Sequence, residues 1–431
     1  PELGDEWFSR SRGGESRQRE GDCGAAWRLR SLAAPNKCHH AISRMDTTMG
    51  SREPSADVMT VLGPVPADTL GWTSVHEHVL CDATVYRRRA ERTRPERLAA
   101  ILAAMPNGDR LADAPVSLET VGLCRAEYTV QLDNMRLDDM AVMAGELSDF
   151  HASGGRTVVE MSALGLRTNV EGLKQLSQTT GVHIVAAAGF YIEDSWPADV
   201  RRFAPEQFAQ RILSELRDGI AETGIQAGHI KLAVTDLSAA QEAALRGGAR
   251  AAAQTGAMVT VHPGFGIGSD GRRITEILAQ EGLSTRQIVI AHADAFIVPT
   301  GLQRLVLGDV SWELNLDYHR ELLDQGVNLS FDCFGQSWTD EVNDVVSECD
   351  WHRLAAVVAL LREGYVEHLV LGNDVFLKML TRRGGGEGYC RLTRWAVPTL
   401  RRFGVSDFDI NCMLERNPAR LLANLDLATA G

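Results

Sequence analysis

Six residues of types that bind metal ions or carry out acid–base chemistry recur along the chain. They are two histidines separated by one residue, a lysine, two more histidines and an aspartate: His76, His78, Lys231, His262, His292 and Asp374. Neutral imidazole and carboxylate are the ligands that zinc and similar divalent ions prefer in proteins. A lone His-x-His pair is weak evidence, because most such pairs are structural or lie on the surface. The six residues therefore predict a metal site only if the fold brings them together.

Short apolar runs rich in β-branched residues, bounded by Gly, Pro or polar residues, begin at about Val58 and predict eight strands. These predicted strands are Thr73–Leu80, Thr157–Met161, Ile184–Tyr191, His229–Val234, Met258–Pro263, Ile288–Asp294, Asn328–Phe334 and His368–Asp374. Helical periodicity fills most of the gaps between them. The clearest helical segments are Met140–His151, Pro205–Glu222, Ala239–Gln254, Ile274–Gln280, Trp351–Glu363 and Asn417–Leu425.

This alternation of strands and helices predicts parallel strands joined by crossover helices. Eight such units over roughly 370 residues fit a (β/α)₈ TIM barrel with insertions. A doubly wound open sheet is the alternative. Two stretches fit the simple alternation poorly, namely the charged connection Asp82–Ala126 and the span Phe296–Gln325. The predicted fold class is α/β, a TIM barrel.

The candidate ligands fall where such a barrel places its active site. Residues i and i+2 of a strand point to the same face, so the paired histidines of the first strand both enter the barrel while Glu77 points outward. The two later histidines and the aspartate fall at the C-terminal ends of later strands, and Lys231 lies within the fourth strand. These strand ends converge on one mouth, where the active sites of this fold are found. The pattern therefore indicates a metal site at the C-terminal mouth.

Lys231 allows two interpretations. It is either a lysine that reaches the mouth or pairs with a carboxylate, or a group that takes part in metal binding. An unpaired buried ammonium is costly and tends to lose its proton. The neutral amine can react with carbon dioxide to give a carbamate, which carries a negative charge and two oxygens. Such a group can bridge two cations that an ammonium would repel.

The chain resembles the phosphotriesterase family of the amidohydrolase superfamily from about Val61 to its C-terminus. It looks closest to the phosphotriesterase-related branch, through HEHV, GVHIVAAAGFY and FDCFG. The matching stretches are VLGPVPADTLGWTSVHEHVL, GVHIVAAAGFY, IKLAV, VHPG, AHAD, FDCFG, LGND and RNPARLL. Some members of that branch carry Glu at the position of Lys231, whereas triesterases and lactonases carry Lys.

The resemblance implies a binuclear site for two divalent ions, zinc or alternatively manganese or cobalt. His76, His78 and Asp374 would hold the more buried ion. His262 and His292 would hold the more exposed one. The lysine of the fourth strand, carboxylated on its Nζ, and a hydroxide would bridge the two ions.

Four residues are expected to act in catalysis or substrate binding. Asp374 is placed to take the proton from the attacking hydroxide. Asp294 would be a relay for that proton, or alternatively a helix N-cap or turn residue. Tyr191 would contact the substrate, or pack as a core or rim aromatic. Cys333 is a candidate substrate contact that stands where lactonase-type relatives carry arginine, which weakens a lactonase assignment.

Composition limits the partners that the protein can have. The net charge of −13 argues against nucleic acid or an anionic membrane. No apolar run approaches the roughly 18 residues that a membrane span needs. The cysteines lie far apart and form no C-x-x-C pair, which suits a reducing cytoplasm. We therefore expect a cytoplasmic protein with a small-molecule substrate, and the resemblance implies a homodimer.

Two segments of different composition divide the chain. Residues 1–57 are polar, Gly-rich and of mixed charge, and they are expected to be a disordered or non-native N-terminal extension. Residues 58–431 are expected to form the (β/α)₈ metal-dependent hydrolase domain.

The predicted function is hydrolysis of a carboxylic ester, lactone or amide bond, or of a phosphoester, by a metal-bridging hydroxide. Carbonyl substrates are expected to be preferred, because long connections near the mouth favour a small polar ligand over a bulky triester. The alternatives are an organophosphate phosphotriesterase and a non-catalytic barrel that binds a small molecule. All six ligand positions are filled, which counts against the binding barrel.

Overall fold

The structure is a computed structural model that describes residues 56–265, 268–297, 314–343 and 345–424. The N-terminal extension predicted for residues 1–57 lies almost wholly outside the described residues. Most of the poorly fitting span Phe296–Gln325 lies outside them as well. All the strands and helices below belong to one of the two units into which the chain divides, Glu53–Gly431.

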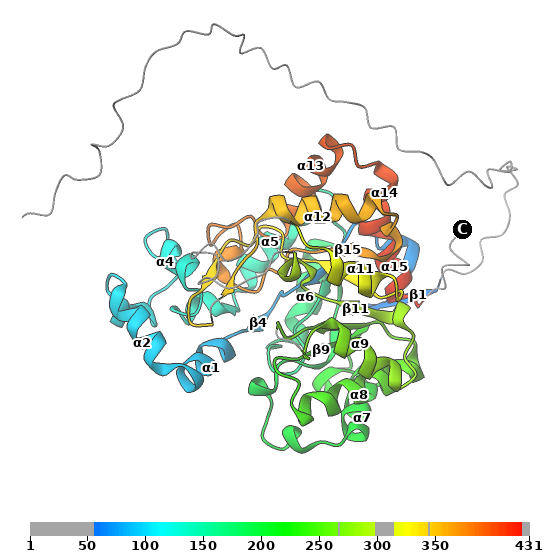
Figure 1. Ribbon diagram of the computed structural model, residues 1–431, viewed down its shortest axis with the longest axis horizontal. Helices are drawn as coiled ribbons and strands as arrows, with labels where there is room; N and C mark the ends of the chain where they lie inside the picture. The colour runs from blue at the N-terminus through cyan, green and yellow to red at the C-terminus, as the bar shows by residue number, and fades with distance from the viewer. Residues whose placement is uncertain (1–55, 266–267, 298–313, 344, 425–431) are drawn as a thin grey trace, which may run out of the picture. The chain divides into compact units, whose positions relative to one another are not determined.

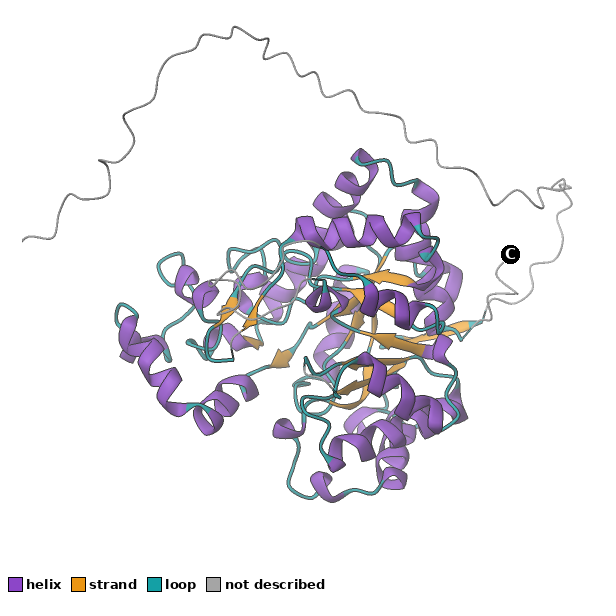
Figure 2. Cartoon of the chain, viewed as in Figure 1, coloured by secondary structure: helices purple, strands orange, loops and turns teal. Residues whose placement is uncertain are grey.

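Parallel strands form a barrel in which neighbours follow the order of the sequence, and Figure 2 shows the strands with helices around them. One sheet has the order β3-β6-β7, and the other contains β8, β9, β10, β11, β12 and β15 as successive neighbours, all paired in parallel. The strands are β3 (Thr73–Glu77), β6 (Thr157–Glu160), β7 (His183–Val185), β8 (Ala187–Phe190), β9 (His229–Ala233), β10 (Val259–His262), β11 (Ile288–Ile290), β12 (Asn328–Phe331) and β15 (Leu369–Leu371). The ring closes between the first and last strands, where the Asp374 amide donates to the His76 carbonyl at 2.9 Å. The predicted TIM barrel is confirmed, and the open sheet is excluded.

The third predicted strand, Ile184–Tyr191, is two strands in the structure. The chain leaves β7 at Ala186 and continues as β8, so β7 pairs with β6 and β8 pairs with β9. The Ala186 carbonyl accepts from the Gly228 amide at 2.9 Å, which joins the two sheets at this break. Closing a sheet into a barrel requires its strands to tilt and stagger, and this is where the third strand turns from one neighbour to the other.

Helices follow most of the strands, as predicted. They include α5 (Met140–Ala152), α6 (Val170–Thr180), α7 (Pro205–Arg217), α8 (Ala239–Thr255), α9 (Gly271–Gln280), α11 (Asp317–Leu323), α12 (Asp350–Arg362), α13 (Val397–Arg402), α14 (Asp407–Asn411) and α15 (Asn417–Leu422). Local sequence sets their ends. Ser238 caps α8 by accepting from the Gln241 amide, and Gly256 ends it in the left-handed region at φ 75°. The helix predicted over Pro205–Glu222 stops at Arg217, because Gly219 follows with φ 118°.

The charged first connection holds short elements of its own. It contains α1 (Val85–Thr93), α2 (Pro95–Ala104), α3 (Gly108–Leu111) and α4 (Val121–Ala126), followed by β5 (Arg136–Leu137), which pairs with β4 (Cys81–Asp82). Figure 1 shows α1, α2 and α4 on the side of the barrel away from α7 and α8. This connection brings aromatic side chains to the barrel mouth.

Apolar side chains fill the end of the barrel opposite the mouth. Val75, Val159, Val289 and Val370 from the strands form one buried cluster with Leu421 of α15. The antiparallel hairpin of β1 (Asp57–Thr60) and β2 (Gly63–Pro66) adds further apolar side chains there. Burying these side chains stabilises the barrel by about 1.5–3 kcal/mol each. Among the described residues, no helix has the length and apolar character needed to cross a membrane.

Candidate active site

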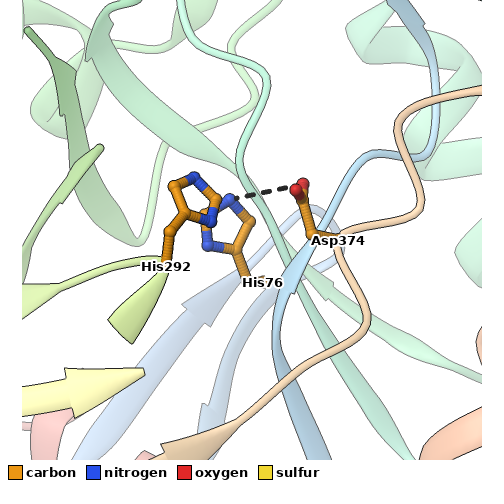
Figure 3. A group of neighbouring side chains, drawn as sticks. All are labelled: His76, His292 and Asp374. Atoms are coloured by element: carbon orange, nitrogen blue, oxygen red, sulfur yellow. Dashed lines mark ion pairs between the residues drawn. The ribbon is translucent and has the colours of Figure 1, made fainter. Parts of the chain in front are cut away.

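The strand ends bring the six predicted ligands into one cluster. His76 and His78 come from the end of β3, Lys231 from β9, and His262 from the end of β10. His292 follows β11 after Ala291, and Asp374 follows β15 after Gly372 and Asn373, rather than lying within these strands as predicted. Figure 3 shows the rings of His76 and His292 beside each other, with the carboxylate of Asp374 directed at His76. All six side chains are buried except that of His262, which is half-buried.

Short distances connect these side chains. The Asp374 Oδ1 atom lies 3.3 Å from His78 Nε2 and 3.6 Å from His76 Nε2. Lys231 Nζ lies 3.3 Å from His76 Nε2. The ring of His292 lies with its centroid 4.8 Å from that of His76 and 4.6 Å from that of His262. The cluster thus gathers imidazole, amine and carboxylate groups at one point of the mouth.

Asp332, which the sequence analysis did not select, holds two of the imidazoles. Its carboxylate oxygens lie 2.7 Å from His76 Nδ1 and 2.9 Å from His292 Nδ1. A carboxylate can only accept, so each Nδ1 carries the hydrogen and each Nε2 keeps its lone pair for a metal ion. Asp332 could have been selected from the sequence, because it is an acidic residue directly after the barrel strand β12. Asp374 has a similar position, two residues further from the end of β15.

The other two histidines also fit a metal site. His78 Nδ1 lies 2.8 Å from Ser162 Oγ, which leaves Nε2 facing Asp374. His262 Nδ1 is a buried nitrogen with no hydrogen-bond partner among the described residues. A buried polar atom without a partner is costly, and a metal ion would satisfy this one. The nitrogen and oxygen donors suit zinc, manganese or cobalt.

The electrostatics keep two of the imidazoles and the Asp374 carboxylate in the form that binds metals, whereas for His292 the burial that lowers the pKa is outweighed by Asp332, which raises it. Burial and the nearby Lys231 lower the pKa of His76 to about 4. Burial and His292 lower the pKa of His262 well below its usual value. Burial disfavours ionised Asp374, but its histidine neighbours, His76 foremost, lower its pKa below the usual range. Neutral imidazoles and an ionised carboxylate are the states that metal ligation requires.

Lys231 is fully buried, and burial lowers its pKa to about 8, although Asp332 and Asp374 act in the opposite direction. About one amine in ten is then neutral at pH 7, compared with about one in three thousand at the ordinary pKa of lysine. The chemistry that a lysine needs for carboxylation is therefore accessible at neutral pH.

Two of the site residues have strained backbones. His292 and Asp374 adopt positive φ angles of 55° and 49°. The left-handed conformation costs a residue with a side chain roughly 1–2 kcal/mol and persists only where the surroundings enforce it. It also explains why the predicted strands end before these residues. Such strain concentrates at functional sites.

The remaining predicted residues lie at or next to the cluster. Tyr191 is buried with its ring centroid 5.8 Å from that of His262, and its hydroxyl is hydrogen-bonded to that of Tyr86. Cys333 Sγ lies 3.7 Å from His292 Nδ1. Both residues can therefore line the mouth, and their substrate contacts stay predictions.

Asp294 contacts residues behind the cluster. Its Oδ2 accepts from the Asp332 amide at 2.9 Å, and its Oδ1 lies 3.0 Å from Arg353 Nε. Burial raises the pKa of Asp294 to about 6, against the effect of Arg353. The relay role therefore stays a prediction, and these contacts show Asp294 supporting Asp332.

Two further features of the mouth were not predicted from the sequence. Gln336 Nε2 donates to Asp374 Oδ2 at 3.0 Å and to the Asp374 carbonyl at 2.9 Å. Aromatic rings from the first connection pack against rings from later βα loops. Together they form an aromatic wall, composed of Tyr86, Tyr128, Trp338 and Phe376. Phe376 also lies beside His78, with ring centroids 6.4 Å apart. Neither feature has a sequence signal, because both depend on loops that meet only in the folded chain.

A TIM barrel with such a cluster of histidine, lysine and aspartate at its mouth belongs to the class of barrel hydrolases. The model of the phosphotriesterase family matches residues 56–422. The chain therefore belongs to the phosphotriesterase family and is a hydrolase, as the sequence analysis predicted.

Relatives and solved structures cover nearly the whole described chain. The N-acetyltaurine hydrolase of Tetraodon nigroviridis is 28% identical over 374 residues, which are 85% of this chain and 98% of the relative. The crystal structure of a resiniferatoxin-binding protein from Rhodobacter sphaeroides matches with a TM-score of 0.73 and 28% identity, over 87% of this chain and 99% of that one. A mutant PTE-like lactonase from Deinococcus radiodurans matches with a TM-score of 0.62 and 25% identity, over 85% and 99% of the two chains.

Proposed function

We propose that the protein is a binuclear metal-dependent hydrolase that cleaves the amide or ester bond of small acyl compounds. The observation that carries the proposal is the buried cluster in which Asp332 binds the Nδ1 atoms of His76 and His292, so that their Nε2 lone pairs are the ones that can ligate a metal ion. His76, His78 and Asp374 would hold one ion, and His262 and His292 the other.

Lys231 would join the two halves of this site as a carbamate. Its Nζ lies beside His76 in the cluster, and its lowered pKa of about 8 supplies the neutral amine. The new N–C bond to carbon dioxide releases one proton from the amine. The resulting group has two oxygens and a negative charge, which suit it to bridge two cations. A surface lysine would remain an ammonium at neutral pH.

Two divalent ions held here would supply the Lewis acidity that lowers the pKa of a water molecule and polarises the scissile oxygen. Asp374 has an ionised carboxylate at the cluster and would take the proton released as the nucleophile attacks. Gln336 donates to Oδ2 of that carboxylate and leaves Oδ1 facing the histidines. The aromatic wall would exclude bulk water from the reacting groups.

The substrate class follows from the mouth and from the relatives. Phe376 of the aromatic wall lies beside His78, and a wall at this place would favour a small acyl group over a bulky triester. The relative from Tetraodon nigroviridis is named an N-acetyltaurine hydrolase, and N-acetyltaurine is such a compound, an amide of a small acid. Lactones are the second candidate, since a PTE-like lactonase shares the fold at 25% identity. A phosphotriesterase and a non-catalytic binding barrel are the remaining alternatives.

A substrate panel tests this proposal. Purified protein loaded with zinc, manganese or cobalt is assayed with N-acetyltaurine, other N-acyl amides, aryl esters, lactones and an aryl phosphotriester. We expect an amide or ester to have the highest kcat/KM. A triester value a hundredfold above every carbonyl substrate, about 2.7 kcal/mol of transition-state preference, would favour the phosphotriesterase. Tight binding without turnover would favour the binding barrel. The cytoplasmic location and the homodimer stay predictions.

A further inference from the structure

Glu77, the residue between the two histidines of β3, has no role in the mechanism above. Its side chain is fully buried, although the strand pattern directs it away from the barrel interior. Its carboxylate accepts hydrogen bonds from the backbone amides of Asn373 and Val375, each at 3.1 Å. It also accepts from Asn373 Nδ2 at 2.7 Å and from Ser74 Oγ at 2.5 Å. A buried side chain that accepts from this many donors fixes the positions of the groups that donate to it.

The segment held by Glu77 is the turn that carries Asp374. The amides on either side of Asp374 bind the two oxygens of Glu77, one each. The amide of Asp374 itself donates to the His76 carbonyl at 2.9 Å. All three successive amides of the turn are thus fastened to β3, the strand that carries two of the proposed ligands. Within this turn Asp374 adopts the left-handed φ of 49°.

We propose that Glu77 is the positioning residue that holds Asp374 in its strained conformation and thereby directs its carboxylate at the histidines. This inference rests on the role proposed for Asp374 in the site. The strained conformation needs enforcement by its surroundings, and the two bonds from Glu77 flank it directly. Gln336 also binds Asp374, by donating to its carbonyl and to Oδ2.

Both oxygens of Glu77 act as acceptors in this contact. In Glu77→Gln one oxygen becomes an NH₂ group, which in either orientation faces a backbone amide, that of Val375 or that of Asn373. One donor then loses its partner in a buried place, and the turn is freed on one side. Ser74→Ala is a milder variant, because it removes one donor to Glu77 and leaves both backbone amides bound.

A matched control comes from Glu146 on α5, which is also buried. Its carboxylate accepts from the backbone amides of Arg382 and Arg383 at 3.0 and 3.2 Å, as Glu77 does at the Asp374 turn, and it also pairs with the Arg383 guanidinium at 3.2 Å. Glu146→Gln should lower the melting temperature as Glu77→Gln does, but leave kcat unchanged.

The first measurement is hydrogen exchange of the metal-free protein, followed by mass spectrometry. We expect peptides that cover Asn373–Val375 to exchange about tenfold faster in Glu77→Gln than in wild type. Exchange in Glu146→Gln should rise only at Arg382 and Arg383. Ser74→Ala should show a smaller change of the same direction, and it replaces Glu77→Gln if the latter does not fold.

The second measurement is turnover and metal retention of the loaded enzyme. Glu77→Gln should lower kcat and metal affinity by about 10–100-fold, with KM within about threefold of wild type. Unchanged exchange at Asn373–Val375 would overturn the inference, as would a fall in kcat no larger than that of Glu146→Gln. If the wild-type protein neither bound metal nor hydrolysed any compound of the panel, the proposed function would fail. The exchange experiment would then still decide whether Glu77 holds the turn.

Discussion

At the level of single residues, the carboxylate of Asp332 sets the orientation and tautomer of two imidazoles in the candidate site. Asp332 is fully buried and contacts the Nδ1 atoms of His76 and His292. Burial opposes its ionisation, but these two imidazoles lower the pKa of Asp332 well below its usual range. The two rings are thereby held in one tautomer with Nε2 directed at the cluster.

Replacing Asp332 with asparagine should weaken metal binding by about 10–100-fold. The amide oxygen can accept from one imidazole, but the amide NH₂ group would face the other Nδ1–H. Competition with a chromophoric chelator measures the affinity of each variant. An affinity within twofold of wild type would show that Asp332 does not orient the ligands.

Lys231 should be indispensable, and a carboxylate should partly replace it. Lys231→Ala should lose both metal and activity, added acetate should restore part of each, and Lys231→Glu should keep some function. Because burial lowers the lysine pKa to about 8, the neutral amine becomes scarcer as the pH falls. Reactivation of metal-free enzyme by bicarbonate and metal should slow about tenfold per pH unit below 8. A pH-independent rate would contradict the carbamate.

Asp374→Asn should lower turnover without lowering the stability of the fold. Asparagine tolerates the left-handed conformation better than most residues, so the melting temperature should stay close to that of wild type. The amide cannot take a proton, and turnover should fall at least about a hundredfold, as for other groups that act in acid–base catalysis. Circular dichroism and the substrate assay check the two expectations. Wild-type turnover with full metal content would refute the role of Asp374 as proton acceptor.

The sequence predicted the residues of the cluster better than their supports. Five of the six candidate ligands could be selected because each is a metal-binding type near a strand end, and Lys231 because it lies within a barrel strand. Ser162 and Gln336 are ordinary residues by type, and only the fold brings them within hydrogen-bonding distance of His78 and Asp374. Asp332 was the one support within reach, since it also follows a barrel strand.

At the scale of elements, helices α8 and α9 are joined by an ion-pair cluster. Glu281 follows α9, and its carboxylate accepts from Arg250 Nε at 2.7 Å and from Arg246 Nη1 at 2.8 Å. Hydrogen bonds from Arg250 and Arg246 lower the pKa of Glu281. The cluster is partly exposed, so its contribution to stability is modest.

Glu281→Gln should destabilise the protein by about 0.5–1 kcal/mol at pH 7. A carboxyl whose pKa is lower in the folded state stabilises above its unfolded pKa, and this stabilisation disappears as the pH falls through the folded pKa. The difference between wild type and variant should therefore shrink as the pH falls below the ordinary glutamate pKa of about 4.3. Urea unfolding at pH 7 and pH 4 measures it, and an equal difference at both values would show that charge is not the cause.

The elements that sequence could predict are those with a regular pattern. The eight apolar runs and the amphipathic helices between them follow from periodicity alone. The break of the third strand at Ala186 could not be seen, because it lies within a uniform run of alanines. Helices α1 and α2 of the first connection were not predicted, because α1 is rich in arginine and α2 is an almost uniform run of Ala, Leu and Ile after Arg97.

In the whole barrel, the apolar side chains that stabilise the fold and the candidate catalytic groups lie at opposite ends. Valines of four strands close one end with α15, while charged and polar groups gather at the mouth. This division is general for TIM barrels, whose loops at the C-terminal ends of the strands carry function. Changes at the mouth are therefore expected to affect activity more than folding.

Hydrolysis by this protein should depend on two metal ions held by the cluster. Chelator-treated, metal-free protein is titrated with zinc in the presence of bicarbonate, and hydrolysis of the best substrate of the panel is followed. We expect no turnover without metal and a linear rise that reaches its plateau at about two ions per chain, as a two-metal site requires. The same titration of His262→Ala should show almost no activity. Full turnover in the metal-free protein, or a plateau at one ion per chain, would contradict it.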